Sequence, residues 1–590
     1  MESATKPGTR ARPRALQAGT LCEAFQATAV ECADQVALRT KGDAVSITWT
    51  EYADRARSIA AGLASLGLGR GDTLALMLTN RPEFNLVDSA AIHLGVTSFS
   101  IYNTSAPEQI EYLLGDAANR VIVTEQAFLE RVLAARPNVP TLEHVVVIDG
   151  PAEGAITLQD VEAQGDPGFD FEASWRAVEP SDVLCLIYTS GTTGPPKGVQ
   201  LTHANLVAEA RSLDQVIPLQ RGTRTISFLP SAHIADRLVS HYAGIFHGFT
   251  LTTCPDPAQL FAYVPEVKPT LFGGVPRIWE KMEAAIAAGI EADPDEEKKQ
   301  ATKWALDVGL RKVRAEQADQ EVPVELLEEH AKAEDLVLSK MRERLGLDEV
   351  QYYVVGAAAT PLEVMEFFAA MGIEILEVWG MSETSAIATM NPPGGVRMGT
   401  VGPPVPGVEV KLADDGEVMV RGPIVMTGYR NMPEKTAETF TDDGWLLTGD
   451  VGAFDEAGYL KIVDRKKELI INAAGKNMSP VNIENHIKSA SPLIGQATAI
   501  GDGRPYNVAL ITLDPDGAAG KGPDDPEVQR AVAEAVERAN SQLSRVEQIK
   551  RFKLLPEEWQ PGGDELTPTM KLKRKPIAAK YEQEIEALYT

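Results

Sequence analysis

The first part of the chain alternates segments of helical hydrophobic periodicity with short, continuously apolar runs. Ala53–Leu66 has the spacing of an amphipathic helix and precedes the apolar run Thr73–Leu78; Glu83–Leu94 and Thr97–Ile101 repeat this pattern. Similar units continue up to His144–Ile148. A short apolar run between two helices is typical of a strand that is buried on both faces. The pattern therefore predicts an α/β fold with a largely parallel sheet covered by helices.

The alternation resumes after Pro180 and is then interrupted by a charged region. Apolar runs predict strands at Val183–Tyr188, Thr225–Leu229, Leu271–Phe272 and Tyr352–Val355. Residues 284–347 combine helical spacing with many charges, as in Asp293–Gln300. Charges on helical spacing usually mark a solvated helix face, so we expect a solvated insertion. An acidic docking surface for a partner is the alternative.

After Asn391 the pattern changes to short strands. Turns with Gly, Pro or Asp-Gly separate runs such as Val408–Leu412 and Glu417–Arg421, which favours antiparallel hairpins. The final part mixes both element types: the expected elements are a helix at Val481–Ser489, a strand at Val508–Leu513 and a helix at Asp525–Leu543. We therefore expect a β-rich portion on a large domain, followed by a small α+β domain.

Length and composition indicate a globular protein of several domains. A typical domain holds roughly 100–200 residues, so the 590 residues imply at least two domains. Hydrophobic residues make up 44% and charged residues 24% of the chain, which excludes wholesale disorder. The formal net charge of −28 makes binding to nucleic acid unfavourable. An anionic ligand must therefore be bound by a local cluster of donors.

Cysteine usage and hydropathy favour a cytoplasmic protein. The four cysteines, Cys22, Cys32, Cys185 and Cys254, form no CxxC pair and are too few for a disulfide framework. The sequence contains no apolar stretch that approaches the length of a membrane span. Residues 1–20 contain arginines without an apolar segment, which favours a disordered tail over a transit peptide.

The segment Leu186–Val199, LIYTSGTTGPPKGV, carries a strong chemical signal. An apolar strand leads into a loop whose candidate phosphate ligands are Thr189, Ser190, Gly191, Thr192, Thr193, Gly194 and Lys197. Glycines let backbone N–H groups approach a polyphosphate, and the hydroxyls and the lysine add donors and charge. Pro196 and Gly198 exclude a Walker A loop, which needs Gly before the lysine and Ser or Thr after it. A flexible surface turn is the alternative.

Residues Thr189–Gly198 match the signature Ser/Thr-Ser-Gly-Thr-Thr-Gly-x-Pro-Lys-Gly. From about Leu21 to its C-terminus, the sequence resembles the adenylate-forming superfamily of acyl-CoA synthetases, luciferases and adenylation domains. The resemblance implies a large N-terminal α/β domain with mostly parallel, helix-covered sheets and a β-rich portion, and a small mobile α+β C-terminal domain. It also implies activation of a carboxylic acid with ATP and Mg²⁺, with coenzyme A as co-substrate.

Glu377–Thr384, EVWGMSET, resembles the superfamily's Tyr-Gly-x-Thr-Glu segment. The resemblance implies that Trp379 packs on adenine next to Gly380, that Ser382 contacts phosphate and that Glu383 holds magnesium. Trp replaces Tyr and Ser replaces Thr, but an indole still stacks and a serine keeps the hydroxyl. In isolation, such residues would be interpreted as core and surface positions.

Small residues surround the expected acyl and adenine sites. Gly356, Ala357 and Ala358 follow a strand and leave room for a flat ring; the resemblance places adenine and the acyl group there, while the alternative is a packing turn. Two stretches, Pro230–Arg237 and Phe272–Arg277, resemble the acyl pocket of long-chain fatty acyl-CoA synthetases. The implied acyl-pocket residues are His233, Gly274 and Val275. For His233, a structural role in a helix is the alternative.

Trp445–Asp450 and Asp464–Lys467 would be a plain Gly-Asp turn and a plain basic turn without the resemblance. The resemblance makes Asp450 the acceptor of both ribose hydroxyls and Arg465 a further ribose contact. It makes Lys467 the hinge. The expected domains are therefore an AMP-binding domain at residues 1–466 and a small lid domain at residues 467–590.

Leu566–Arg574, LTPTMKLKR, aligns with a superfamily stretch that carries an essential lysine. The resemblance assigns this role to Lys571, with Lys573 as the alternative assignment and plain surface charge as the alternative function. Met570 stands where the superfamily usually has glycine. A mobile domain that carries one cation suits the expected chemistry.

The implied reaction has two steps. A carboxylate oxygen attacks the α-phosphorus of ATP and pyrophosphate leaves; the thiol of coenzyme A then attacks the acyl adenylate and AMP leaves. Positioning and charge neutralisation dominate such catalysis, and the expected catalytic residues are Thr189, Glu383 and Lys571. Between the steps the small domain would rotate and bring Gly475 and Lys476 to the pantetheine path.

We therefore expect an AMP-forming ligase of long-chain fatty acids and coenzyme A. The alternatives are an acyl-AMP ligase that loads a carrier protein, and a coenzyme A ligase for a medium-chain, aryl or sterol side-chain acid. Two alternatives come from other classes of protein. A P-loop phosphotransferase would release ADP, and Pro196–Gly198 disfavours it. A non-catalytic nucleotide-binding module would lack the glutamate and the terminal lysine, both of which are present. Because the chain ends soon after Lys571, we expect no carrier, reductase or thioesterase domain to follow. Chain-length preference, oligomeric state and peripheral membrane association stay open.

Overall fold

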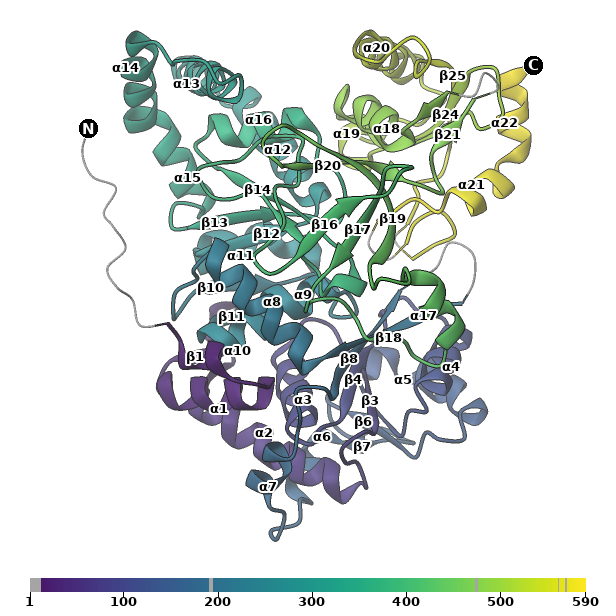
Figure 1. The fold of residues 1–590 in the computed structure, drawn as a ribbon. Coiled ribbons are helices and arrows are strands. Elements are labelled where there is room, and N and C mark those ends of the chain that lie inside the picture. The colour runs from purple at the N-terminus through teal and green to yellow at the C-terminus, as the bar shows by residue number, and fades with distance from the viewer. Residues whose placement is uncertain (1–11, 190–194, 473–475, 561, 568–569) are drawn as a thin grey trace.

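The chain forms a large N-terminal body and a separate C-terminal region. The structure, a computed structural model, describes residues 12–189, 195–472, 476–560, 562–567 and 570–590. The N-terminal body consists of sheets covered by helices, and the C-terminal region, green to yellow at the upper right of Figure 1, mixes strands and helices. The expected α/β fold class is confirmed.

An eight-stranded sheet lies within the N-terminal body. Its strands, in spatial order, are β18 (Gly428–Tyr429), β9 (Lys197–Thr202), β8 (Val183–Thr189), β4 (Thr97–Ser100), β3 (Thr73–Met77), β5 (Val121–Thr124), β6 (His144–Val147) and β7 (Ile156–Thr157). The neighbouring strands from β8 through β4, β3, β5 and β6 to β7 pair in parallel. At the other end of the sheet, β9 pairs antiparallel with both β8 and β18. The parallel strands are largely buried, which explains their continuous apolar runs.

Two further sheets each combine three parallel strands with one antiparallel strand. The first has the order β10 (Arg224–Ser227), β11 (Thr250–Thr253), β1 (Val36–Thr40) and β2 (Ser46–Thr48). The second has the order β12 (Leu271–Gly274), β13 (Tyr352–Val355), β14 (Ile375–Trp379) and β15 (Thr389–Met390). Because β12, β13 and β14 are parallel, their carboxyl ends meet at one edge, where α/β proteins commonly bind ligands.

The remaining strands form the β-rich portion and the C-terminal region. The β-rich portion is an antiparallel sheet of β16 (Glu409–Leu412), β17 (Glu417–Arg421), β19 (Leu446–Phe454) and β20 (Leu460–Arg465). The C-terminal region contains the hairpin β21 (Ile470–Ile471) and β22 (Asn477–Met478) and the sheet β23 (Ile494–Ile500), β24 (Asn507–Leu513) and β25 (Ile549–Leu554). The buried apolar side chains of this region form clusters of their own, as a separate domain requires.

The helices pack over these sheets. In the N-terminal body they are α1 (Leu21–Glu31), α2 (Trp49–Ser65), α3 (Pro82–His93), α4 (Pro107–Asp116), α5 (Gln126–Ala135), α6 (Leu158–Ala163), α7 (Phe171–Arg176), α8 (His203–Val216), α9 (Ile234–Asp236), α10 (Ala243–His247), α11 (Leu260–Val267), α16 (Leu362–Ala370) and α17 (Pro433–Thr439). In the C-terminal region they are α18 (Pro480–Ser489), α19 (Pro515–Ala518), α20 (Pro526–Gln542), α21 (Arg574–Lys580) and α22 (Glu582–Tyr589). Across the described ranges, no helix has the length and apolar character needed to cross a membrane.

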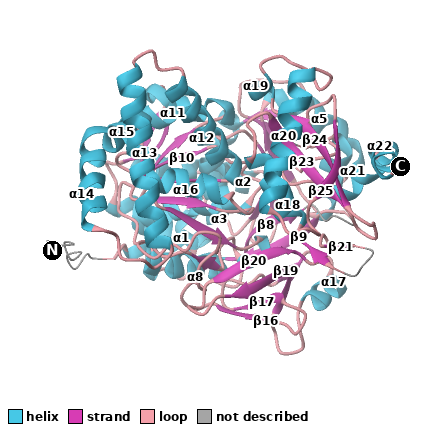
Figure 2. Ribbon diagram, turned by 90° about the horizontal axis from the view of Figure 1, so that it is seen from above, coloured by secondary structure: helices cyan, strands magenta, loops and turns pink. Residues whose placement is uncertain are grey.

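The charged insertion is helical, as its pattern predicts. It consists of α12 (Pro276–Glu291), α13 (Glu296–Gln317), α14 (Val324–Ala333), the π-helical turn η6 (Glu334–Leu338) and α15 (Ser339–Leu345). One face of α13 packs closely on α16, since a Cβ atom at Gly309 would lie 2.1 Å from the carbonyl oxygen of Ala370. The insertion is therefore solvated on its outer side only. Figure 2 shows these helices on the left and the C-terminal elements on the right.

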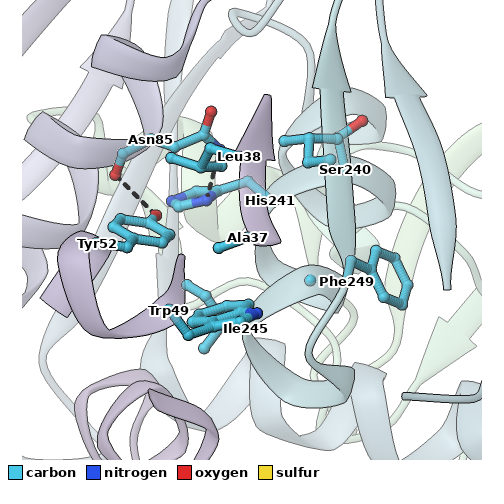
Figure 3. A pocket seen from close by; sticks show the side chains of 11 residues that line it. Ala37, Leu38, Trp49, Tyr52, Asn85, Ser240, His241, Ile245 and Phe249 are labelled. Atoms are coloured by element: carbon cyan, nitrogen blue, oxygen red, sulfur yellow. Dashed lines mark hydrogen bonds between the residues drawn. The ribbon is translucent and has the colours of Figure 1, made fainter. Parts of the chain in front are cut away.

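A buried polar network lies beneath the stretch expected to line the acyl pocket. Arg237, in the π-helical turn η4 (Arg237–Tyr242), donates from Nη1 to Asp88 Oδ1 at 2.8 Å, and both side chains are fully buried. His241 Nε2 lies 3.0 Å from Asp88 Oδ2, and His241 Nδ1 lies 3.0 Å from Asn85 Nδ2. His241 and Asn85 line a cavity of about 10 Å³ (Figure 3), which has room for about one water molecule.

Three buried histidines of the N-terminal body are neutral near pH 7. Burial lowers the pKa of His203 to about 3 and the pKa values of His93 and His233 to about 4. An unfolded histidine has a pKa near 6.5. Between about pH 4 and 6.5 these three histidines therefore bind more protons in the unfolded chain than in the folded chain, so their own contribution to stability decreases as the pH falls through this window. Burial raises the pKa values of Asp236 and Glu377 to about 7, and these carboxyls contribute in the opposite direction.

We expect His203 to lower the free energy of unfolding of the N-terminal body by about 1.4 kcal/mol for each pH unit between about 6.5 and 5. His203 Nδ1 accepts from the backbone N–H of Leu21 at 3.2 Å. The substitution His203→Asn keeps an acceptor at this place but removes the titrating group, so the free energy of unfolding of the variant relative to the original protein should rise as the pH is lowered. Urea titrations of both proteins at several pH values measure this difference in free energy, and a difference that stays constant between pH 7 and 5 would contradict the prediction.

Candidate active site

The residues expected around adenine and the acyl group lie at the carboxyl edge of β12, β13 and β14. Gly274 pairs with Val355 at the ends of β12 and β13, and the N–H of Gly356 donates to the carbonyl oxygen of Gly274 at 3.3 Å. Ala357 has a φ of +72°, which costs a non-glycine residue about 1–2 kcal/mol. Ala358 is exposed at the same edge. Backbone strain of this kind clusters at functional sites.

Trp379 ends β14, and the chain then turns sharply. A Cβ atom at Gly380 would lie 2.1 Å from the carbonyl oxygen of Ala386, so this position requires glycine. Ser382 and Glu383 follow in the 3₁₀ turn η7 (Ser382–Thr384), and both are buried. The turn therefore keeps the end of the segment Glu377–Thr384 compact and close to the carboxyl ends of the strands.

Asp450, Trp379 and Arg465 form one polar cluster. Asp450 lies in β19 directly opposite Arg465 of β20. Its Oδ2 accepts from Trp379 Nε1 at 2.9 Å, and its Oδ1 lies 2.8 Å from Arg465 Nε. Burial raises the pKa of Asp450, although the charge of Arg465 and the hydrogen bond from Trp379 favour the ionised form. Three residues from separate sequence segments thus meet at one place.

Lys571 follows the tip of a narrow hairpin. Leu566 and Leu572 pair across it, and the N–H of Thr567 donates to the carbonyl oxygen of Lys571 at 2.8 Å. Met570, at the tip, has a φ of +65°, in the left-handed region that favours glycine. The unusual Met570 therefore occupies a position whose backbone geometry suits the glycine of the superfamily pattern. Residues 568 and 569 lie outside the described part of the hairpin.

The Lys571 ammonium group lies within electrostatic reach of the Asp450 cluster. The residue keeps exposed surface, but its ammonium group is surrounded by protein. This desolvation lowers the pKa of Lys571, the charge of Arg465 lowers it further, and the charges of Asp450 and Glu383 raise it. The charge of Lys571 in turn helps burial to lower the pKa of His233, which precedes α9.

Thr189 and Lys197 are the described ends of the expected phosphate loop. They face each other at the end of the antiparallel pair β8–β9. Desolvation lowers the pKa of Lys197; the charge of Glu383 opposes this effect, and nearby cations that include Lys435 and Lys467 reinforce it. The other expected phosphate ligands, Ser190, Gly191, Thr192, Thr193 and Gly194, lie outside the described residues.

Tyr429 is a residue of this site that the sequence analysis did not identify. Lys197 Nζ donates to Tyr429 Oη at 3.0 Å, and Tyr429 Oη donates to Glu383 Oε1 at 2.7 Å. Tyr429 reaches this place because β18 pairs with β9, where Tyr429 lies opposite Val199. A lone tyrosine after a glycine carries no chemical pattern, so its role depends on this long-range pairing.

The structure describes two of the residues expected to serve domain movement. Lys467 follows β20 and is exposed, and its charge acts on Lys197 as described. Lys476 directly precedes β22 and is exposed, and its N–H donates to Asn472 Oδ1 at 3.0 Å. Gly475 lies outside the described residues.

Polar contacts join the C-terminal region to the N-terminal body. Arg277, at the start of α12, forms an ion pair with Asp514 of the C-terminal region. Lys488 Nζ of α18 lies 3.9 Å from Glu280 Oε1 of α12. These contacts occur beside Val275, the residue that precedes α12 and is expected to line the acyl pocket. The arrangement therefore brings Lys571 to the site through a polar interface.

The residues fit a magnesium ion that arrives with a nucleotide. In the part of the chain that the structure describes, no group of three or more His, Cys, Asp or Glu side chains gathers as a metal site. Nucleotide-bound Mg²⁺ needs just one or two protein carboxylates, because phosphate and water oxygens complete its coordination. Glu383 is buried beside the phosphate-loop lysine and supplies one such carboxylate.

Comparison of the sequence with known protein families identifies the family of this chain. Residues 25–430 match the family described as AMP-binding enzyme. The chain belongs to the AMP-binding enzyme family. Residues 467–590 of this AMP-binding enzyme match the AMP-binding enzyme C-terminal domain. The first match contains Lys197, Trp379, Glu383 and Tyr429, and the second contains Lys571.

Curated relatives of this AMP-binding enzyme are named as fatty-acid–CoA ligases. FadD11 of Mycobacterium tuberculosis (strain ATCC 25618 / H37Rv), a fatty-acid–CoA ligase by name, is 53% identical over 452 residues, which cover 74% of this chain and 79% of the relative. The long-chain-fatty-acid–CoA ligase FadD15 of Mycobacterium bovis is 37% identical over 92% of both chains. The long-chain-fatty-acid–CoA ligase ACSBG2 of Xenopus laevis is 31% identical over 97% of this chain and 84% of the relative.

Solved structures share the fold of this AMP-binding enzyme. The anthranilate CoA ligase AuaEII, in complex with anthranoyl-AMP, superposes with a TM-score of 0.72 at 22% identity and covers 95% of this chain and 97% of its own. The adenylation domain of a carboxylate reductase from Mycobacterium chelonae gives a TM-score of 0.76 at 21% identity and covers 98% of this chain and 92% of its own. At these identities the likeness concerns the fold alone.

Proposed function

We propose that this AMP-binding enzyme ligates a long-chain fatty acid to coenzyme A through an acyl adenylate and releases AMP and pyrophosphate. The observation that carries the proposal is that Trp379, which ends β14, bonds to Asp450 at 2.9 Å, while Glu383, four residues further on, is linked through Tyr429 to Lys197 of the phosphate loop. The charges of Asp450 and Glu383 also act on Lys571. The names of the relatives support the fatty acid as substrate and coenzyme A as acceptor.

The Asp450 cluster suits the nucleoside part of ATP. Asp450 Oδ2 accepts a hydrogen bond from Trp379, and Asp450 Oδ1 forms an ion pair with Arg465. Each oxygen retains a lone pair for a ribose hydroxyl. The same carboxylate fixes the indole of Trp379, whose face can then stack on adenine. Arg465 holds Asp450 from the other side and provides a further ribose contact.

In the first step a carboxylate oxygen of the fatty acid bonds to the α-phosphorus, and the bond to the pyrophosphate oxygen breaks. Two anions must approach each other, so neutralisation of charge lowers the barrier. We assign Lys571 to the α-phosphate, Lys197 and Thr189 to the leaving phosphates, and Ser382 to a phosphate contact. Glu383 would hold Mg²⁺, which supplies further neutralisation of the phosphates when bound.

In the second step the sulfur of coenzyme A bonds to the acyl carbon, and AMP leaves with the bond electrons. Lys571 would obstruct the thiol in its present place. We therefore assign Lys467 as the hinge between residues 1–466 and 467–590, about which the small domain rotates. The rotation would break the ion pair of Arg277 with Asp514 and bring Gly475 and Lys476 to the pantetheine path.

The acyl site is built from small and uncharged groups. Gly274 ends β12 and Val275 follows it, so neither position has a polar side chain, and the low pKa of His233, about 4, keeps its imidazole neutral at pH 7. A neutral histidine at the entrance imposes a smaller desolvation cost on an alkyl chain than a charged one would. This lining favours an apolar acid over an amino acid.

The proposal is tested by incubating the protein with ATP, Mg²⁺ and fatty acids of graded length, with and without coenzyme A, and identifying products by mass spectrometry. We expect acyl-CoA, AMP and pyrophosphate. An acyl adenylate that persists in the presence of coenzyme A would instead indicate a carrier-protein acceptor, and ADP would contradict adenylate chemistry. We also propose a cytoplasmic location, where both co-substrates occur and the four free thiols stay reduced.

A further inference from the structure

We infer that Tyr429 is a positioning residue. Its hydroxyl group bridges the phosphate-loop lysine and the metal-binding carboxylate by hydrogen bonds and prevents a direct ion pair between them. The inference rests on the proposed adenylating function, because Lys197 and Glu383 take their roles from it. Tyr429 itself contacts no reacting atom in this scheme. It acts through the two ionic side chains that its hydroxyl group joins.

The three side chains form a continuous chain of hydrogen bonds. Lys197 Nζ lies 3.0 Å from Tyr429 Oη and 4.1 Å from the centroid of its ring, while Tyr429 Oη lies 2.7 Å from Glu383 Oε1. Tyr429 and Glu383 each expose just 4% of their surface. The ring and the hydroxyl thus hold the same ammonium group by a cation–π contact and a hydrogen bond.

The direction of this chain is fixed by chemistry. A phenol has one proton to donate, and an ammonium group can donate only. Lys197 therefore donates to the hydroxyl oxygen, and the hydroxyl proton points to Glu383 Oε1. A tyrosine hydroxyl keeps its proton near neutral pH. Glu383 Oε2 is left for the metal.

The backbone around Tyr429 is held in place from both sides. β18 pairs with β9, which carries Lys197, so the two side chains share one sheet. The N–H of Tyr429 donates to Thr436 Oγ1 of α17 at 2.9 Å. A Cβ atom at Gly428 would lie 2.8 Å from Thr436 Cγ2, which explains the glycine before the tyrosine. The fold therefore fixes the hydroxyl rather than leaving it to a flexible side chain.

The hydroxyl has a specific consequence for the site. Without it, the partly buried ammonium group of Lys197 and the buried carboxylate of Glu383 would pair directly, since each would otherwise lose a hydrogen-bond partner. Direct pairing would withdraw Lys197 from the leaving phosphates and Glu383 from the metal together. Tyr429 prevents this by satisfying both groups at once.

The substitution Tyr429→Phe tests this inference because it keeps the ring over Lys197 and removes the hydroxyl alone. We expect ATP–pyrophosphate exchange with a fatty acid to slow by about 10–100-fold, the usual effect of losing a partner that orients a metal ligand. We also expect calorimetry to show at least a tenfold loss of affinity for α,β-methylene-ATP in the presence of Mg²⁺, with little change in its absence. Thiolysis of a preformed acyl adenylate should stay within about twofold.

Tyr459→Phe is a matched control. Its hydroxyl donates to the carbonyl oxygen of Gly395 at 2.9 Å, and Arg397 lies 5.0 Å from its ring centroid, so it has the same two kinds of contact away from the site. Exchange should be unchanged in this variant. The inference would be overturned if Tyr429→Phe left both the exchange rate and the affinity for the nucleotide with Mg²⁺ unchanged. Equal losses in both half-reactions, together with a lowered melting temperature, would also overturn it. Failure of the wild-type enzyme to catalyse exchange would instead refute the proposed function.

Discussion

Replacing Lys571 with alanine is expected to slow acyl-adenylate formation by about 10²–10³-fold, the usual effect of removing one group that stabilises transition-state charge. The charges of Arg465, Asp450 and Glu383 act on the ammonium group of Lys571, and desolvation strengthens its field on a neighbouring phosphate. In the proposed mechanism the second step follows a rotation of the small domain and needs no cation at this place. Thiolysis of a preformed acyl adenylate should therefore change less than about threefold.

Single-turnover measurements of the two half-reactions separate these effects. The control is Lys573→Ala, two residues away on the same hairpin strand, whose ammonium group donates to the carbonyl oxygen of Gly563 at 2.8 Å. We expect this variant to form adenylate at nearly the normal rate. Equal loss of both half-reactions in Lys571→Ala, or the larger loss in Lys573→Ala, would show that the catalytic lysine has been assigned wrongly.

Asp88→Asn is expected to destabilise the N-terminal body by about 3–5 kcal/mol, because it leaves the buried Arg237 without a counter-charge. Burial opposes ionisation of Asp88, but the charge of Arg237 and the hydrogen bond from His241 outweigh it and hold the pKa of Asp88 below its ordinary value. The contribution of this carboxylate to stability is therefore present above its unfolded pKa and is lost as the pH falls through its lower folded pKa.

Urea unfolding at pH 7, followed by tryptophan fluorescence, measures this loss. The exposed pair of Arg421 with Glu409 serves as the control, since Glu409→Gln should leave the midpoint almost unchanged. A double variant, Asp88→Leu with Arg237→Met, should be less destabilised than Asp88→Asn, because no charge stays buried alone. A loss below about 1 kcal/mol in Asp88→Asn would mean that water or another group replaces the missing charge.

Much of the fold follows from local pattern. The strand Tyr352–Val355 coincides with β13, and the expected helix Val481–Ser489 differs from α18 by one residue. Buried parallel strands and capped amphipathic helices leave such patterns because each depends on its own residues. The alternative for His233, a structural role within a helix, differs from the structure in one respect. His233 lies just before α9 as its N-terminal cap, so it belongs to a turn and not to a helix.

The parts of the site that the sequence did not reveal depend on long-range pairing. Tyr429 meets Lys197 through two strands that lie 230 residues apart along the chain, counted from position 199 to position 429. The bond from Trp379 to Asp450 similarly joins two sheets. Arg277 looked like part of an acyl-pocket stretch, yet its guanidinium group pairs with Asp514 of the C-terminal region. No periodicity encodes contacts of this kind.

The polar interface between the two parts of the enzyme has a consequence for turnover. Its ion pairs would bind two free proteins weakly, because partly exposed pairs contribute little. The connection near Lys467 makes the association intramolecular, and short linkers produce effective concentrations in the millimolar range. A weak interface is then sufficient to hold Lys571 at the site. Because each part keeps an apolar core of its own, separating them exposes no core, and the rotation that we propose would exchange one docking arrangement for another without unfolding either part.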